Sequence, residues 1–211
     1  LFGSQRQRRN TKQSALGNLR GQGYLDAAVQ YEASRREGGT MAIRVVVVEG
    51  PRVVVGDVAF EGLKASKPAR ILPELVATKG APASDLALQR DHLMVSSVLH
   101  DEGLIESAVE QRATRSADRK SVSIVYAVKE GPVYKLGKVA IEGNSKHKDA
   151  LYAAALSPLK KGATFDRSKV AGARDAMQRL HDDPATSAMV DVETEVDAKK
   201  LLVHVTFRVS P

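Results

Sequence analysis

Apolar and polar positions follow one another along this chain in short segments whose periods change. Residues 42–48 are almost wholly apolar and β-branched, which predicts a strand that is buried on both sides or lies centrally in its sheet. Residues 53–60 and 122–128 predict further strands, since β-branched residues recur in both. Residues 84–99 carry apolar side chains about 3.6 positions apart, which predicts an amphipathic helix.

The same order of segments recurs at a fixed spacing. Glu49-Gly50-Pro51 has its counterpart 81 positions later in Glu130-Gly131-Pro132. Leu19 precedes a similar helix-to-strand junction, and Leu99 and Leu180 follow it at intervals of 80 and 81 residues. A constant offset of this size indicates internal repeats, so the chain holds three copies of one unit.

Each complete repeat has the order strand, helix, helix, strand, strand. The fold class predicted is therefore α+β, with tandem β-α-α-β-β domains, each a three-stranded mixed sheet with two helices on one face. Residues 1–50 form a partial domain, which holds the second helix and strands two and three. Residues 51–131 and residues 132–211 form two complete domains.

Local signals predict where the helices lie. Ser84 and Asp166 are expected to cap the second helices of the two complete repeats. First helices are expected at about residues 66–78 and 146–156, with a kink or a late start at Pro73. In the partial repeat, a frayed start precedes a helix at about residues 11–20. Glu37-Gly38-Gly39 signals a hairpin turn.

The composition excludes several kinds of functional site and favours some classes of partner. The 211 residues include no cysteine, which excludes disulfides, thiolate zinc sites and a cysteine nucleophile. No apolar run reaches the ~18 residues that a membrane-spanning helix needs. The net charge of +7 favours nucleic acid, anionic lipid or acidic partners, or simply a solvated basic surface.

Two His-Asp pairs, His100-Asp101 and His181-Asp182, recur at the end of the second helix. No further histidine or carboxylate recurs with them at ligand spacing, so we interpret them as exposed polar residues at a helix end. Nucleophile, P-loop and dinucleotide motifs are absent from the sequence. We therefore expect no enzyme activity, no cofactor and no metal site.

An RNA-binding array is the alternative from another class. KH modules share the β-α-α-β order and clamp the nucleic-acid backbone with a Gly-x-x-Gly loop between two helices. The corresponding segments here, residues 79–82 and 161–164, hold one glycine each. Aromatic residues for base stacking are also scarce, so nucleic acid is not the expected partner.

Residues 130–144, Gly162–Asp166 and Leu19–Tyr24 resemble the polypeptide-transport-associated (POTRA) domain, and the resemblance covers essentially the whole chain in three tandem copies. Residues 183–186 stand where Gly-Tyr is usual, and Leu104 replaces that Tyr in the second copy. The resemblance implies the periplasmic arm of a BamA- or TamA-type outer-membrane assembly protein. It would lie on the periplasmic side of the bacterial outer membrane, with a β-barrel expected beyond Pro211.

The implied function is binding of unfolded outer-membrane protein precursors and accessory assembly proteins. If the apolar third strand is central, the second strand is an edge, which can pair with an incoming extended chain by β-augmentation. The arm of a two-partner-secretion transporter, with a dedicated cargo, is the alternative within the same fold.

Candidate edges are residues 25–31 and 104–111, with residues 189–195 in the third copy. The predicted peptide-binding residues are Leu25, Ala27, Val29, Tyr31, Ile105, Ser107, Val109 and Gln111. The predicted structural turn residues are Gly50, Pro51, Gly131 and Pro132.

Overall fold

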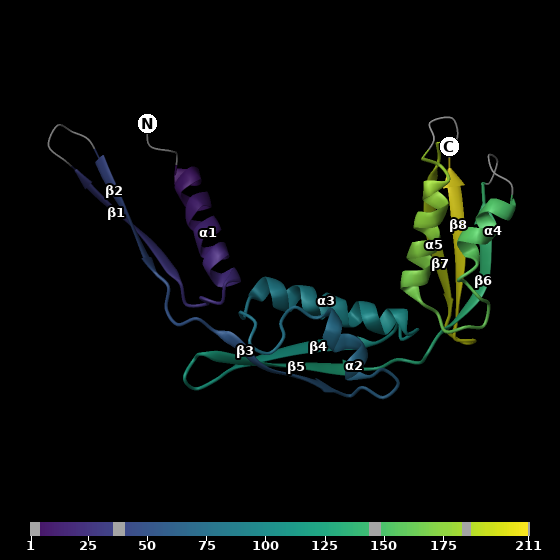
Figure 1. The fold of residues 1–211 in the computed structure, drawn as a ribbon, viewed down its shortest axis with the longest axis horizontal. Helices are drawn as coiled ribbons and strands as arrows, with labels where there is room; N and C mark the ends of the chain where they lie inside the picture. The colour runs from purple at the N-terminus through teal and green to yellow at the C-terminus, as the bar shows by residue number, and fades with distance from the viewer. Residues whose placement is uncertain (1–4, 36–40, 144–148, 183–186, 211) are drawn as a thin grey trace. The chain divides into compact units, whose positions relative to one another are not determined.

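The computed structural model describes residues 5–35, 41–143, 149–182 and 187–210 (Figure 1). The chain divides into two compact units. Unit 1 comprises Leu1–Gly62, Pro68–Val95 and Val109–Val128, and unit 2 comprises Leu63–Lys67, Ser96–Ala108 and Lys129–Pro211. The predicted turn Glu37-Gly38-Gly39 lies outside the described residues.

The helices and strands follow the predicted repeat. In chain order they are α1 (Gln5–Gly21), β1 (Ala28–Arg35), β2 (Met41–Val48), β3 (Val54–Glu61), α2 (Pro68–Ile71), the 3-10 helix η1 (Leu72–Glu74), α3 (Asp85–Asp101), β4 (Ala108–Arg115), β5 (Ser121–Lys129), β6 (Lys135–Glu142), α4 (Asp149–Leu156), α5 (Arg167–Arg179), β7 (Met189–Asp197) and β8 (Leu202–Ser210). The order strand, helix, helix, strand, strand occurs twice from β3 onward, which confirms the predicted α+β class.

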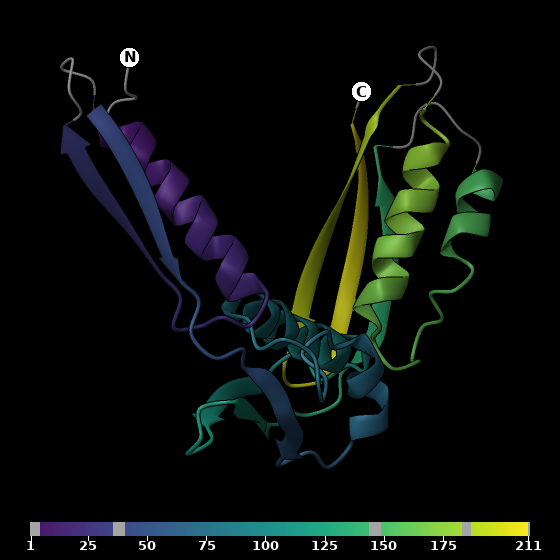
Figure 2. The same cartoon turned by 60° about the vertical axis from the view of Figure 1, so that its left-hand side comes forward.

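The third strand of each complete repeat lies in the middle of its sheet, which meets the condition under which the second strand was expected to be an edge. The strand orders are β3-β5-β4 and β6-β8-β7. In the last sheet β6 runs parallel to β8 and β7 runs antiparallel to it. Both β4 and β7 are therefore edge strands, and α4 and α5 lie along one face of the β6-β8-β7 sheet (Figure 2).

Strand β2 departs from its prediction. It pairs with β1 in a two-stranded sheet of the described residues, so it is not central there. Val45 and Val47 are 52% and 48% exposed. A continuous apolar run favours a strand, but burial of both faces also needs elements packed against both faces, and within the described ranges β1 is the one strand that pairs with β2.

The first helix of the second repeat is shorter than predicted. Pro73 lies in η1, and α2 has only four residues, because proline cannot donate the backbone hydrogen bond that a continuing α-helix needs. Asp91, fully buried on α3, accepts hydrogen bonds from the N–H groups of Val76 at 3.0 Å and Ala77 at 2.7 Å. A side chain of α3 thus satisfies backbone donors that follow the short helix.

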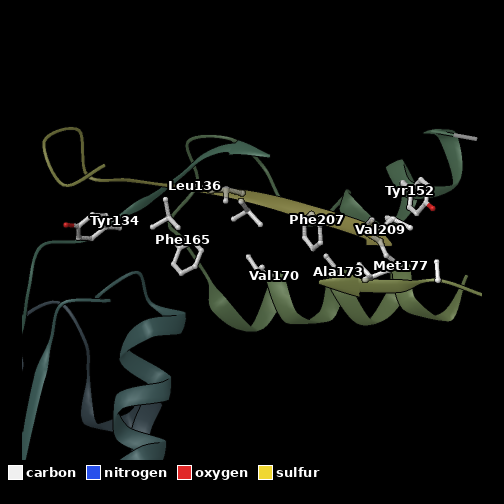
Figure 3. Close-up of a cluster of buried hydrophobic side chains, with 13 residues drawn as sticks. Tyr134, Leu136, Tyr152, Phe165, Val170, Ala173, Met177, Phe207 and Val209 are labelled. Atoms are coloured by element: carbon white, nitrogen blue, oxygen red, sulfur yellow. The ribbon is translucent and has the colours of Figure 1, made fainter. Parts of the chain in front are cut away.

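Unit 2 has an apolar cluster between its helices and its sheet (Figure 3). Val170, Ala173 and Met177 are buried on α5 at intervals of three and four residues, which places them on one face of the helix. Opposite them, Phe207 of β8 is 0% exposed, and burial of such a side chain contributes about 1.5–3 kcal/mol. This packing holds α5 beside the edge strand β7.

Candidate functional site: an open strand edge beside an apolar groove

One end of the β7 edge is closed by side chains of α5. Gln178 accepts a hydrogen bond from the Val190 N–H at 2.9 Å and donates to the Ala188 carbonyl at 2.9 Å. The Arg174 Nε donates to the Val190 carbonyl at 3.1 Å. These bonds show that the backbone groups of Val190 point away from β8.

The rest of the edge is open. Backbone groups alternate in direction along an antiparallel strand, so those of Val192, Thr194 and Val196 point outward like those of Val190. Within the described part of the chain, no strand or side chain is bonded to these outward groups. Three residues of β7 therefore offer N–H donors and C=O acceptors to an added strand.

An apolar groove runs between α5 and this open edge. Its volume is about 450 Å³. The lining residues are Ile105, Phe165, Arg167, Val170, Ala171, Arg174, Asp191, Val192, Thr194, Val196 and Val203. Phe165 and Val170 lie at the start of α5 in Figure 3. An added strand would place alternate side chains in this groove.

The start of α5 is held by a cap that the sequence predicted. Asp166 accepts a hydrogen bond from the Lys169 N–H at 3.0 Å and from the Ser168 hydroxyl at 2.6 Å. Partial burial alone would raise the pKa of Asp166, but these hydrogen bonds, and the charge of Lys169, hold the pKa below its ordinary value. Asp101 accepts the Ser168 N–H at 3.0 Å, and Arg167 contacts the Ser97 hydroxyl.

The opposite edge of the same sheet is less suited to adding a strand. The register of β6 against β8 shifts between Leu136 and Val139, an irregularity that disturbs pairing. Lys135 bridges to Thr164 of the loop before α5, and Leu136 donates to the Ala163 carbonyl at 2.8 Å. The loop thus covers the start of this edge, which leaves β7 as the more accessible side.

In unit 1, the side chain at the corresponding position of β4 is hydrogen-bonded to α3 and to β5. Gln111 of β4 donates to the Leu88 carbonyl of α3 at 3.2 Å and to the Tyr126 hydroxyl at 3.3 Å. Burial, and then the charge of Asp91, raise the pKa of Tyr126 to about 12, so its hydroxyl stays protonated. Gln111 aligns in the repeat with Val192, which makes no such bond.

The residues predicted for the first edge lie partly outside it. Leu25 and Ala27 precede β1, which begins at Ala28. Val29 is on β1 but is buried. Tyr31 lies on β1, opposite Val45, and is half-buried. Of these four residues, Tyr31 is the one on β1 whose side chain is partly accessible.

The residues predicted for the second edge divide in the same way. Ile105 and Ser107 precede β4, which begins at Ala108, while Val109 and Gln111 lie on it. Ser107 accepts the Gly131 N–H at 3.2 Å. Ile105 packs against the buried cluster of unit 2 and lines the groove beside β7. Ile105 is the predicted residue that the structure brings to the open edge.

The predicted turn residues lie in short irregular connections, residues 49–53 and 130–134. Gly50 has φ of 74°, a conformation that favours glycine. Position 131 has no room for a side chain, because a Cβ there would lie 2.9 Å from the Cβ of Glu106. Pro51 and Pro132 are exposed beside them.

The His-Asp pairs are not equivalent, and their prediction was wrong for one histidine. His181 is only 2% exposed, and its Nε2 lies 2.8 Å from the hydroxyl of buried Tyr152. Asp101, as described above, accepts the Ser168 N–H in the first turn of α5. Among the described residues, no group of three or more His, Asp or Glu side chains could hold a metal ion.

The glycine N–H groups of the two loops that a KH-like module would use are already hydrogen-bonded within the fold. Gly80 donates to the Val55 carbonyl at 2.8 Å, and Gly162 donates to the Leu136 carbonyl at 2.8 Å. Both glycine N–H groups thus bond to the first strand of their repeat and do not point to a ligand. A helix long and apolar enough to cross a membrane does not occur in the described ranges.

The residues of the open edge itself were missed as site residues. Residues 189–195 were predicted to form an edge, but no side chain there was predicted to bind a peptide. Val190, Val192, Thr194 and Val196 alternate with Asp191, Glu193 and Glu195, and this alternation was the available signal.

Two curated relatives share part of this sequence. One, from Treponema pallidum, is provisionally named an outer membrane protein assembly factor and is 31% identical over 134 residues, 58% of this chain and 16% of that protein. The other, from Nitratidesulfovibrio vulgaris, is named outer membrane protein assembly factor BamA and is 24% identical over 131 residues, 60% of this chain and 17% of that protein. The chain therefore spans about a sixth of the length of both relatives.

Two solved structures share the fold. The BamA POTRA3-5 structure of Haemophilus influenzae has a TM-score of 0.61 and 16% identity, and the match covers 100% of this chain and 84% of that one. The Haemophilus ducreyi BamA structure lacking POTRA domains 1-3 has a TM-score of 0.56 and 16% identity, covering 74% and 28%. The POTRA family model, described as surface antigen variable number repeat, matches residues 53–131 and 134–211, so this chain belongs to the POTRA family.

Proposed function

We propose that this chain belongs to the periplasmic arm of an outer-membrane assembly protein and binds extended segments of unfolded outer-membrane precursors. The POTRA match and the names of the two curated relatives support this class of function. Accessory assembly proteins and an outer-membrane β-barrel are further partners in the proposal. We propose a binding role and no catalysis.

The observation that carries the proposal is the open edge of β7 beside its groove. Val192, Thr194 and Val196 present outward backbone groups, and the same residues line the apolar groove against α5. An added strand would gain main-chain hydrogen bonds and bury its apolar side chains together. Backbone pairing depends little on side-chain identity, so it suits a range of precursors better than one dedicated secretion cargo.

Proline substitution tests edge pairing in the intact chain. A photoreactive p-benzoylphenylalanine at Glu195, which is exposed on β7, should crosslink to an unfolded outer-membrane barrel protein held in dilute urea. Thr194→Pro removes an outward N–H without breaking a β7–β8 hydrogen bond, and should abolish the crosslink. Thr194→Val keeps the N–H and should retain the crosslink.

Two further variants make the result specific. Ala113→Pro places the same change on β4 and should leave the Glu195 crosslink intact. Ala171→Trp fills the groove from α5 and should weaken the crosslink without altering the β7 backbone. Crosslinking that survives both Thr194→Pro and Ala171→Trp, in variants with unchanged circular dichroism, would show that β7 is not the binding edge.

A further inference from the structure

The face of β7 that points away from the groove carries a carboxylate at every second residue. Asp191, Glu193 and Glu195 are all exposed at alternate positions, and Asp197 follows in the same alternation; Asp191 also borders the groove near its Arg174 end. The other face of β7 lines the groove with Val192 and its neighbours. The strand is therefore apolar toward α5 and acidic toward solvent.

These carboxylates are only partly neutralised. Arg208 of β8 contacts Glu193 at 2.6 Å but also Glu142 at 3.3 Å, so one cation serves two carboxylates. Asp197 pairs with Lys200 at 3.3 Å. Among the described residues, neither Asp191 nor Glu195 has an ion pair.

Neighbouring cations do not change this balance on the edge. Lys138 and Lys199 line a hollow that includes Glu195, but they form no ion pair with it. His204, directly opposite Glu195 on β8, accepts the Lys138 N–H through Nδ1 at 2.9 Å. Arg174 and Arg167, at the groove, are paired with Asp175 at 2.9 Å and with Asp101 at 3.8 Å.

An incoming strand must satisfy both faces. Its alternate side chains on the helix side would meet Val192, Val196 and Val170, so they should be apolar. Its intervening side chains would lie next to Asp191, Glu193 and Glu195. Opposite charges facing each other across two strands attract, and like charges repel.

We propose that the β7 edge selects extended segments in which apolar residues alternate with lysine or arginine, a preference that rests on the proposed strand-binding function. The same face of β4 carries Glu110, Arg112 and Thr114, a mixed set. Arg112 contacts Glu61 at 2.9 Å and Glu110 at 3.6 Å, so the acidic face belongs to β7 and not to β4.

Three matched peptides test this preference with the full 211-residue chain. They share the same apolar residues at alternate positions and carry lysine, serine or glutamate at the others. Fluorescence anisotropy at low salt should show about 10-fold tighter binding of the lysine peptide than of the glutamate peptide. The difference should shrink at high salt, because exposed charges are screened. Since the whole chain has a net charge of +7, non-specific attraction would favour the glutamate peptide instead.

Variants separate the possible results. The double variant Asp191→Lys and Glu195→Lys should reverse the order of the peptides, while Glu193 stays to pair Arg208. Equal affinities for all three peptides, each lost in Thr194→Pro, would overturn the charge preference and leave the strand-binding function standing. Lysine-peptide binding that survives Thr194→Pro would also overturn the inference, since the attraction would not need strand pairing. Absence of binding by any peptide would overturn the proposed function itself.

Discussion

Asp26 and Arg115, 89 residues apart in sequence, form a two-pronged ion pair within unit 1. The Arg115 guanidinium donates to Oδ1 of Asp26 at 3.0 Å and to Oδ2 at 2.8 Å. Arg119 adds a third hydrogen bond to Oδ1 at 3.0 Å. A carboxylate that follows α1 thus contacts the end of β4, and a planar guanidinium suits this geometry better than a lysine would.

Acid should release this ion pair. The hydrogen bonds from Arg115, followed by the charges of Arg115 and Arg119, hold the pKa of Asp26 below its ordinary value. A lowered folded-state pKa means that the pair contributes stability above the ordinary Asp range and loses it as the pH falls through the lowered value. At neutral pH the guanidinium N–H protons of Arg115 should exchange slowly with solvent, which ¹⁵N NMR of this side chain measures.

Asp26→Asn should free the Arg115 side chain at all pH values, and high salt should have a smaller effect of the same kind. Asp57→Asn, at another exposed carboxylate of unit 1, is the control and should leave the Arg115 resonances unchanged. Resonances of Arg115 that are identical in the native chain and in Asp26→Asn would show that the pair does not persist in solution.

The glutamate of the second Glu-Gly-Pro motif should also make stability depend on pH. Glu130 accepts hydrogen bonds from the N–H groups of Lys64 at 3.0 Å, Ala65 at 2.8 Å and Ser66 at 3.0 Å. Burial would raise its pKa, but the three N–H groups outweigh burial, and the pKa lies below its ordinary value. The carboxylate therefore stabilises the fold above the ordinary Glu range, and this contribution is lost as the pH falls through the lowered pKa.

Glu130→Gln should lower the urea midpoint of unfolding at neutral pH. The gap between this variant and the native chain should narrow in acid, where the native carboxyl is protonated. Glu74→Gln, at a carboxylate of η1, should leave the midpoint nearly unchanged at both pH values. A gap that stays constant with pH would mean that the charge of Glu130 does not act through these N–H groups.

Removal of the α5 cap should destabilise unit 2. Asp166→Ala leaves the N–H of Lys169 without its side-chain acceptor, at a cost of about 1 kcal/mol. Asp166→Asn keeps a capping oxygen and should recover most of that loss. Urea unfolding followed by circular dichroism measures both variants, and equal stability of Asp166→Ala and the native chain would contradict the cap.

Exchange of two aligned residues should move strand binding between edges. Val192→Gln gives β7 the side chain that ties β4 to α3, and should weaken extended-peptide binding about 10-fold, or ~1.4 kcal/mol. Gln111→Val removes the bonds to Leu88 and Tyr126 and should make β4 more accessible. Val192→Leu, which keeps the groove apolar, is the control for Val192→Gln. Unchanged binding by Val192→Gln would show that the groove does not contribute.

The periodicity of apolar residues was sufficient to predict the repeat and most elements, because most strands and helices show an apolar face in the sequence. It placed the starts of the second strands too early in the first two repeats, where β1 begins at Ala28 and β4 at Ala108. Tyr24 donates to the Leu19 carbonyl at 3.0 Å and Gly23 to the Arg20 carbonyl at 3.1 Å, which form a helix-ending motif with glycine at φ of 96°. The turn continues to Ala27, so an alternating pattern there does not mean strand. Leu104, which donates to the Leu99 carbonyl at 2.9 Å, follows the same course.

The site was harder to predict, since it depends on which side chains meet across elements. Gln111 and Val192 occupy aligned positions, yet one ties its edge strand to a helix and the other lines an open groove. Buried Asp91 and His181 look like ordinary surface residues in the sequence. Their burial follows from packing against segments that are distant along the chain, and no local pattern reports it.

Amide hydrogen exchange at single residues of β7 tests the central claim most directly. An extended peptide with alternating apolar residues should slow exchange at the N–H groups of Val192, Thr194 and Val196. Val190 is an internal reference, because its N–H is already bonded to Gln178 at 2.9 Å and should change little. Slowing confined to these three amides is the result that strand addition at β7 requires. Peptide binding that leaves all three unchanged, or protects β4 instead, would contradict it.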